Sequence, residues 1–196
     1  MNFAKTEKDA EDYIKNLFQT HANPPFPYHN QTHTLQVVTH AREIGRYYNL
    51  DETDLFIITI ASWFHDIGHL FGPWEIHEEN GVTIMTKYFA NSSIPPHIIS
   101  AIAGCIRATK FPSHPDTFNE KIICDADTYH FGTTYFRETD SAVKQEAELR
   151  MGTPFPEWHK KAIKFLQMHR FFTQYCQRLL DAGKQCNIEW LGSLQD

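Results

Sequence analysis

The sequence predicts an all-α fold, a single-domain bundle of about eight or nine helices. Most of the chain consists of segments whose apolar residues recur with the period of a helix, joined by short connections rich in Pro, Gly and Asn. No pair of segments has the alternating apolar and polar pattern of neighbouring strands. One segment, 55–64, is apolar on nearly all sides, which predicts a central buried helix on which the others pack.

The first two helices are predicted on either side of a proline-rich loop. Residues 5–20 have apolar side chains at helical spacing, and residues 23–27 (Asn-Pro-Pro-Phe-Pro) must form a loop, because proline fixes φ and has no N–H. A second helix fits residues 30–48. Its inward side chains are predicted to be Leu35, Val38, Ile44 and Tyr48.

The remaining helices follow from the same period and from their caps. Asp51 or Thr53 can cap the buried helix, and Pro95 and Pro96 begin another. The predicted ranges are 55–68, 74–90, 95–109, 116–131, 134–150, 156–169 and 171–183, of which the last two form either two helices or one bent helix. The aromatic residues predicted in the core of this C-terminal pair are Trp158, Phe165, Phe171, Phe172 and Tyr175.

The composition narrows the class of protein. The chain has 196 residues, of which 41% are hydrophobic and 21% charged, so it can bury a sizeable core. Its net charge is −6 and it has no Lys/Arg cluster, which predicts no binding to duplex nucleic acid or to anionic membrane. Small anionic substrates stay open, because a bound divalent cation can reverse the local field. The sequence also leaves a homodimer open.

The cysteines and apolar segments predict a cytoplasmic protein. The four cysteines form no CxxC pair and no signal peptide begins the chain, so we expect reduced thiols. The apolar run at 57–64 is too short to span a bilayer.

Histidine is over-represented, with twelve residues, and several lie beside carboxylates. His65 and Asp66 end the most apolar segment, where a charged side chain is costly unless it is paired or binds a metal. An imidazole and a carboxylate together suit a borderline divalent ion. For the dipeptide alone, a capping Asp beside an interface His is the commoner explanation.

Two further segments carry candidate ligands. His29 and His33 are four residues apart and share a helix face, so they could be two ligands, or one ligand and one proton donor, or a pair of surface histidines. Asp125 and Asp127 interrupt an apolar helix and point about 200° apart on it. One of them should face a site while the other caps, pairs or supports it.

In order, these segments resemble the HD superfamily of metal-dependent phosphohydrolases, and within it a group of small bacterial proteins. The matching segments are YHNQTHT (28–34), WFHDIGH (63–69), HEEN (77–80), IRATKFP (106–112) and IICDADTYHFG (122–132). The resemblance implies one HD-type domain over residues 1–196, with its core at about 28–132 and the helices of 133–190 packed on that core.

The resemblance implies metal ligation by His33, His65, Asp66 and Asp127, with Asp127 chosen over Asp125 because it closes the Ala-Asp step. The YHN segment is also similar to that of cyclic-nucleotide phosphodiesterases, which implies that His29 is a general acid. Relatives usually have Leu-Asp after Asp-Ala-Asp, whereas this chain has Thr128-Tyr129-His130. That departure leaves the substrate-side chemistry open.

The function implied is hydrolysis of a phosphate ester, monoester or diester and nucleotide-like, by a metal-activated water, with Asp66 in the catalytic centre. The cofactor is a divalent ion, with manganese, iron or magnesium favoured and zinc or nickel also compatible. The alternative is a non-catalytic HD-like regulatory module that binds a nucleotide or a metal.

Four satellite residues complete the prediction. Arg107 and Lys110 are the best cations for a substrate phosphate, although complementing the C-terminal end of a helix is an equal alternative. His69 and His77 are candidates for a second metal, with helix capping as the alternative for His69.

Overall fold

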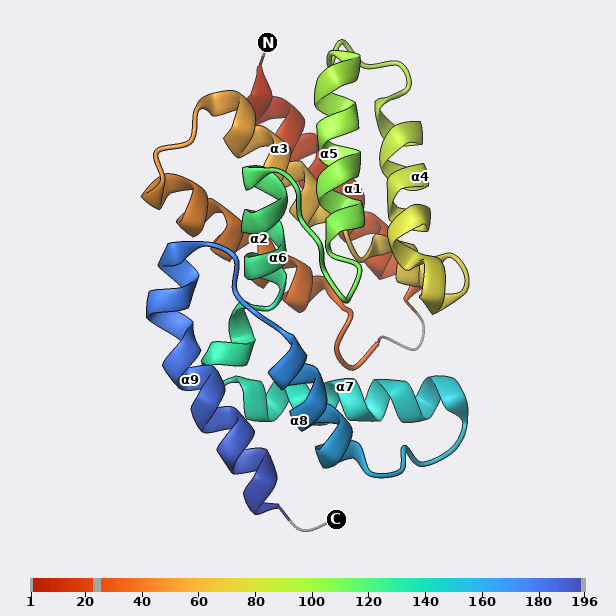
Figure 1. Ribbon diagram of the computed structural model, residues 1–196. Coiled ribbons are helices and arrows are strands. Elements are labelled where there is room, and N and C mark those ends of the chain that lie inside the picture. The colour runs from red at the N-terminus through yellow and green to blue at the C-terminus, as the bar shows by residue number, and fades with distance from the viewer. Residues whose placement is uncertain (1, 23–25, 195–196) are drawn as a thin grey trace.

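The computed structural model describes residues 2–22 and 26–194; positions 23–25 of the predicted proline-rich loop lie outside them. In this part of the chain there are nine α-helices, three short 3-10 helices and no strand, so the all-α prediction is confirmed (Figure 1). The elements are α1 (Phe3–His21), α2 (Gln31–Tyr47), α3 (Glu52–Phe64), η1 (Ile67–Leu70), η2 (Trp74–Ile76), α4 (His77–Phe89), α5 (Pro96–Ala108), α6 (Phe118–Asp127), η3 (Tyr129–Gly132), α7 (Phe136–Met151), α8 (Trp158–Met168) and α9 (Gln174–Ser193).

Side-chain caps set the starts of the helices that carry the site. The Asn30 side chain accepts hydrogen bonds from the backbone N–H groups of Thr32 and His33 at the start of α2. Asp51 caps α3 by accepting from the N–H of Asp54, as predicted. Thr117 and Glu120 form a capping box at α6. Each cap satisfies N–H groups that a helix start leaves without partners.

Two predicted helices are shorter in the structure, and both end at the site. In the predicted range 55–68 the α-helix ends at Phe64, and the short helix η1 follows. In the predicted range 116–131 the α-helix ends at Asp127, and η3 follows. After α3 the chain lies against α4 so closely that a Cβ on Gly68 would be 1.9 Å from the carbonyl oxygen of His77. This packing, which no local pattern encodes, turns the chain away from the helix axis.

Two other sequence predictions need correction, and one alternative that the sequence left open is decided. Leu35 is 45% exposed, because the inward face of α2 is formed by His33, Val37 and their neighbours. The C-terminal pair is two separate helices, since residues 169–173 between them are not helical. The second of these helices runs to Ser193 and not to Gly183, where the missing side chain lets α9 lie against η3: a Cβ there would be 1.9 Å from the carbonyl oxygen of Gly132.

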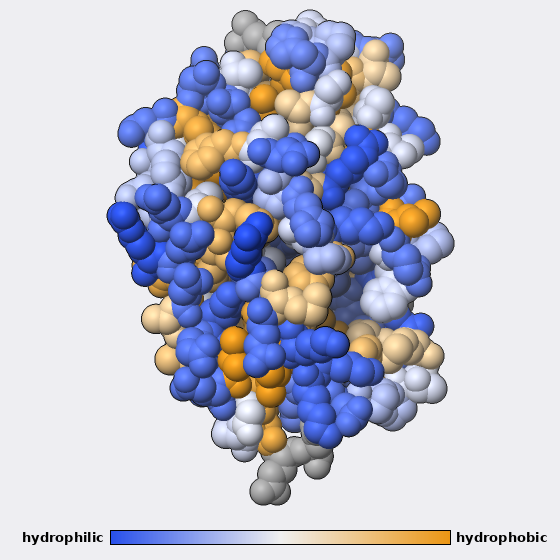
Figure 2. Space-filling view, in the orientation of Figure 1, coloured by the Kyte–Doolittle hydropathy of each residue, from blue (hydrophilic) through white to orange (hydrophobic). Residues whose placement is uncertain are grey.

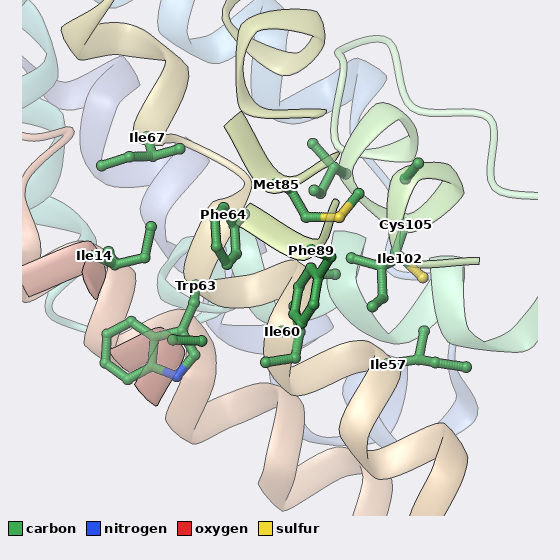
Figure 3. Close-up of a cluster of buried hydrophobic side chains, with 14 of the residues drawn as sticks. Ile14, Ile57, Ile60, Trp63, Phe64, Ile67, Met85, Phe89, Ile102 and Cys105 are labelled. Carbon is green, nitrogen blue, oxygen red and sulfur yellow. The ribbon is translucent and has the colours of Figure 1, made fainter. Parts of the chain in front are cut away.

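The buried apolar residues form two clusters on either side of α3. Ile57, Ile60 and Phe64 pack with α1, α4 and α5 in the cluster of Figure 3, whereas Ile58 packs with α2, α6 and the C-terminal helices. The prediction that 55–64 is the central buried helix is therefore confirmed. In Figure 1 the helices α1–α6 form the upper part of the molecule, α7 and α8 lie below them, and α9 runs down the left side from the level of α6. None of the described helices is long and apolar enough to cross a membrane.

Candidate metal centre

Four side chains from three helices meet where α3 and α6 end. His33 from α2, His65 and Asp66 after α3, and Asp127 at the end of α6 place one ligand atom each within 4.8 Å of the others. His33 Nε2 is 3.2 Å from Asp66 Oδ2 and 3.1 Å from Asp127 Oδ1. His65 Nε2 is 3.1 Å from Asp66 Oδ2 and 3.5 Å from Asp127 Oδ1. The structure therefore brings together the four residues that the sequence predicted as ligands.

The donor atoms fit a divalent cation. Neighbouring ligands of an octahedral ion with bonds of about 2.1 Å lie about 3 Å apart, close to the distances in this cluster. His65 Nε2 and Asp66 Oδ2 are buried and make no hydrogen bond. Unpaired buried polar atoms are costly, and a cation between them would satisfy both. Two imidazoles and two carboxylates suit manganese, iron, zinc or nickel better than an all-oxygen site would.

The histidines and carboxylates of the cluster stabilise one another's charged forms. Burial raises the pKa of Asp66, but the nearby histidines, His65 first, outweigh it and hold the pKa well below its usual range. Burial likewise lowers the pKa of His65, whereas the carboxylates of Asp66 and Asp127 outweigh it and raise the pKa. Because a metal needs deprotonated imidazole nitrogens, protons and metal compete for this cluster, and affinity should fall on acidification.

Asp125 and Asp127 have separate tasks, as their spacing on α6 predicted. Asp127 faces the cluster, whereas Asp125 is fully buried on the other side and accepts hydrogen bonds from the backbone N–H groups of Phe172 and Thr173. Burial raises the pKa of Asp125 to about 6 against the effect of these hydrogen bonds. Asp125 therefore fastens the segment between α8 and α9 to the helix that carries Asp127.

His29 faces the same centre and is held by a residue that sequence reasoning missed. Its Nδ1 is 2.7 Å from Oε1 of Glu146 on α7, and the other oxygen of Glu146 accepts from the backbone N–H groups of Tyr28 and His29. Arg150 also donates to Glu146. Burial raises the pKa of Glu146, but the hydrogen bonds from His29 outweigh it and lower the pKa to about 2. Glu146 is therefore an anion that orients the His29 ring.

The only sequence signal for Glu146 is its position. It follows Val143 by three residues and precedes Ala147, so it lies on the inward face of α7. A charged residue on an apolar face calls for a partner, but that partner is 117 residues away along the chain.

His69 and His77 lie beside the cluster. Their rings stack with centroids 3.9 Å apart, and His77 Nε2 is 3.6 Å from Asp66 Oδ1. Neither ring nitrogen of the buried His69 has a hydrogen-bond partner. His69, Asp66 and His29 form a second group of donor atoms within 4.8 Å of one another. The structure thus places the two predicted satellite histidines next to Asp66, and it adds His29 to them.

The departure at Thr128-Tyr129-His130 leaves the centre open. Tyr129 turns away, because its hydroxyl donates to Glu43 and its ring stacks on His40. His130 is hydrogen-bonded through Nε2 to the Tyr28 hydroxyl and through Nδ1 to Thr139. Burial lowers the pKa of His130 to about 3, so it is a neutral link that fixes Tyr28.

A cavity of about 380 Å³ extends from the centre toward the C-terminal helices. Its wall at the centre contains His29, Asp66, His77 and Asp127, and its far wall is formed mainly by aromatic residues of α7, α8 and the loop after α5. Figure 2 shows a hollow in the surface between the lower ends of α4 and α5 and the level of α7 and α8. Trp158 and Phe165, predicted as core, line this cavity, and Phe165 is 37% exposed.

Arg107 and Lys110 do not line the cavity. Nε and Nη2 of Arg107 donate to the two carboxylate oxygens of Glu79 on the surface, at 2.7 and 3.0 Å. Lys110 Nζ is 3.4 Å from the carbonyl oxygen of Glu75. In this arrangement neither cation is directed at the centre, and their role in phosphate binding stays a prediction.

The protein is all-helical, and a buried cluster of His and Asp side chains lies where its helices end. These two features are those of a helical protein that binds a metal ion. The HD domain family matches residues 30–132, more than half of the chain, and the chain belongs to this family. The family supports a metal-dependent hydrolase in general. No curated protein sequence matches the chain.

Two solved structures have similar folds. The first is a predicted HD superfamily hydrolase from an uncultured Thermotogales bacterium, with a TM-score of 0.60 and 16% identity over 94% of this chain and 88% of that one. The second is Bacillus subtilis YpgQ in complex with ADP, with a TM-score of 0.67 and 15% identity over 98% of this chain and 94% of that one. At these identities the likeness concerns the fold.

Proposed function

We propose that this chain hydrolyses a phosphate ester at the His33, His65, Asp66 and Asp127 centre. The observation that carries the proposal is that Asp66 and Asp127 of this cluster line the same cavity as His29, which is hydrogen-bonded to Glu146. A divalent cation held by the four side chains supplies Lewis-acid activation of a water molecule and neutralises charge on the phosphate. Manganese, iron or magnesium are the ions we favour, with zinc or nickel as alternatives.

His29 is the proposed general acid. Because Nδ1 is hydrogen-bonded to Glu146, Nε2 is the nitrogen left to exchange a proton with the leaving oxygen of the ester. The Tyr28 hydroxyl is hydrogen-bonded to Nε2 of His130 at 2.8 Å, and Tyr28 lines the same cavity, so its ring is a fixed part of the wall beside His29. An ester bound between the cluster and His29 would be oriented for transfer of the proton.

The leaving group and a second ion are the open parts of the proposal. YpgQ, a protein of similar fold, is bound to ADP, which is consistent with a nucleotide-like ester here. His69 and His77 would join the coordination of a second ion next to Asp66. The number of ions therefore distinguishes a support role for these histidines from ligation.

The first experiment combines elemental analysis with a phosphate-ester screen. The purified protein is supplied with manganese or iron, and metal content and hydrolysis of 4-nitrophenyl phosphate and bis(4-nitrophenyl) phosphate are measured beside those of His65→Gln. We expect about one ion per chain, or about two if His69 and His77 bind, with both ion and hydrolysis lost in the variant. Bound metal without hydrolysis of any ester would instead support a non-catalytic regulatory module, and absence of both would overturn the proposal.

A further inference from the structure

The cavity beside the metal centre has two chemically different ends. At the cluster end its wall is polar, with His29, Asp66 and Asp127. Away from the cluster the wall is dominated by Phe111, Val143, Phe155, Trp158, Phe165 and Leu166. Its volume of about 380 Å³ falls in the range of small-molecule sites, roughly 300–1,000 Å³. The space therefore suits a ligand with one polar end and one large apolar end.

Most of the apolar end is built by parts of the chain outside the family match, with Phe111 as a contribution from inside it. Helix α8 contributes Trp158, Ala162 and Phe165, which share one face of the helix, and α7 contributes Val143 from the opposite wall. The ring centroids of Phe165 and Phe111 are 4.1 Å apart, yet Phe165 is still 37% exposed. An aromatic side chain half in contact and half open offers its remaining surface to a ligand.

The charged residues at the apolar end of the cavity disfavour the binding of a second phosphate group. Lys161 is the only Lys or Arg among the residues that line the cavity, and its Nζ lies 4.3 Å from the centre of the Phe155 ring. The buried carboxylate of Asp140 has both oxygens 3.0 Å from the indole nitrogen of Trp158. A polyphosphate that extended from the metal centre would meet the carboxylate of Asp140 and a single cation, Lys161. Phosphate groups are usually bound by several cationic donors, and this end of the cavity does not offer them.

We propose that this cavity binds the organic part of the substrate, and that this part is an uncharged, ring-bearing apolar group. The substrate class is then an aryl or similarly apolar phosphate ester, with the phosphate at the cluster and the rings against α8. The placement of the phosphate rests on the proposed function, whereas the preference for an apolar ring does not. A nucleoside, which needs hydrogen bonds along its base and sugar, is the competing occupant.

Binding of phosphonates tests the preference without turnover, because their P–C bond is not hydrolysed. Methylphosphonate, phenylphosphonate and 1-naphthylphosphonate are titrated into the manganese-supplied protein by isothermal calorimetry. We expect affinity to rise in this order, with the naphthyl compound binding about 30-fold tighter than the methyl compound, because the rings leave water. Affinities within threefold of one another would overturn the proposal, as would tighter binding of the phosphonate analogue of adenosine monophosphate than of 1-naphthylphosphonate.

Variants of α8 locate the binding. Ala162→Phe fills the apolar end, and Lys164→Phe places the same side chain on an exposed position of α8 that does not line the cavity. We expect Ala162→Phe to reduce the naphthyl-to-methyl affinity ratio to about threefold or less, and Lys164→Phe to keep it near 30-fold. Equal ratios in both variants would place the apolar site elsewhere. If Ala162→Phe does not fold, Val143→Phe fills the cavity from α7.

Failure of this proposal is distinguishable from failure of the proposed function. If no ester is hydrolysed but the naphthyl preference is present and Ala162→Phe removes it, the apolar site stands and catalysis does not. If esters are hydrolysed with equal kcat/KM for phenyl and 1-naphthyl phosphate, whose leaving alcohols are of similar acidity, and phosphonate affinities are equal, the catalytic proposal stands and the apolar site does not.

Discussion

The region that matches the HD family and the C-terminal helices contribute different things to one cavity. Residues 30–132 supply the four candidate ligands, each on a helix end fixed by the packing of α2, α3 and α6. Helices α7 and α8 supply Glu146, which holds His29, and most of the apolar wall. The charged centre is therefore encoded in the family part, whereas what can lie next to it is decided outside that part.

Buried charged side chains also have different kinds of partner in the two regions. In the family part, Asp66 and Asp127 lie among histidines whose free nitrogens call for a cation. In the C-terminal part, the buried carboxylates have partners within the protein: Glu146 is hydrogen-bonded to His29 and Arg150, and Asp140 to Trp158. We infer that the first region is built to bind an ion and the second to position groups around it.

The largest expected effect is in the family part. Asp66→Asn keeps the side-chain volume but removes a carboxylate whose oxygens lie 3.2, 3.1 and 3.6 Å from the Nε2 atoms of His33, His65 and His77. We expect loss of the bound ion by elemental analysis and a fall in kcat/KM of about 1,000-fold, because the proposed hydrolysis depends on that ion. Asp12→Asn, an exposed carboxylate on α1, is the control. Retention of metal and activity in Asp66→Asn would contradict the assigned centre.

A smaller effect is expected from the C-terminal part. Glu146→Gln leaves the ion in place but removes the anion that orients His29, so kcat should fall about 10- to 100-fold. The loss should be greater for phenyl phosphate than for 4-nitrophenyl phosphate, since a good leaving group needs less help from an acid. The exposed Glu138→Gln on the same helix is the control. An equal loss for both esters would mean that Glu146 has only a structural role.

The next effect concerns stability and pH at His169, which joins α8 to α9. Burial and then the charge of Lys184 lower the pKa of His169 from 6.5 to about 3. Between these values the unfolded chain binds a proton that the folded protein does not, so stability falls as pH falls below about 6.5. From pH 7 to 5 this contribution is about 2 kcal/mol of unfolding free energy.

His169→Gln removes that titration. Urea unfolding of both proteins at pH 7 and pH 5 should show the variant losing about 2 kcal/mol less than the native protein on acidification. The exposed His97→Gln should follow the native protein. Parallel losses in the native protein and His169→Gln would mean that His169 is protonated in the fold.

The smallest effect is expected at Arg107, which pairs with Glu79 on the surface. Half-exposed ion pairs contribute little, so Arg107→Ala should change the unfolding free energy by less than about 1 kcal/mol. Because Arg107 does not line the cavity, we also expect kcat/KM to change by less than about threefold. A much larger loss would support the phosphate-binding role that the sequence predicted for Arg107.

The sequence by itself determined the all-α fold, the central helix and the four candidate ligands. The fold and the central helix follow from local periodicity, which is readable one segment at a time, whereas the four ligands follow from the resemblance of the ordered motifs to the HD superfamily. It also determined that Asp125 and Asp127 must have different tasks, because residues two apart on a helix cannot face the same point.

Only the tertiary structure decided which partners complete the site. Glu146 meets His29 across 117 residues, and Trp158 and Phe165 line a cavity although their pattern is that of core residues. Arg107 turns to Glu79 although its position suited a phosphate. Helical periodicity tells which face of a helix is turned inward, but not what it meets there, since that depends on how distant helices pack.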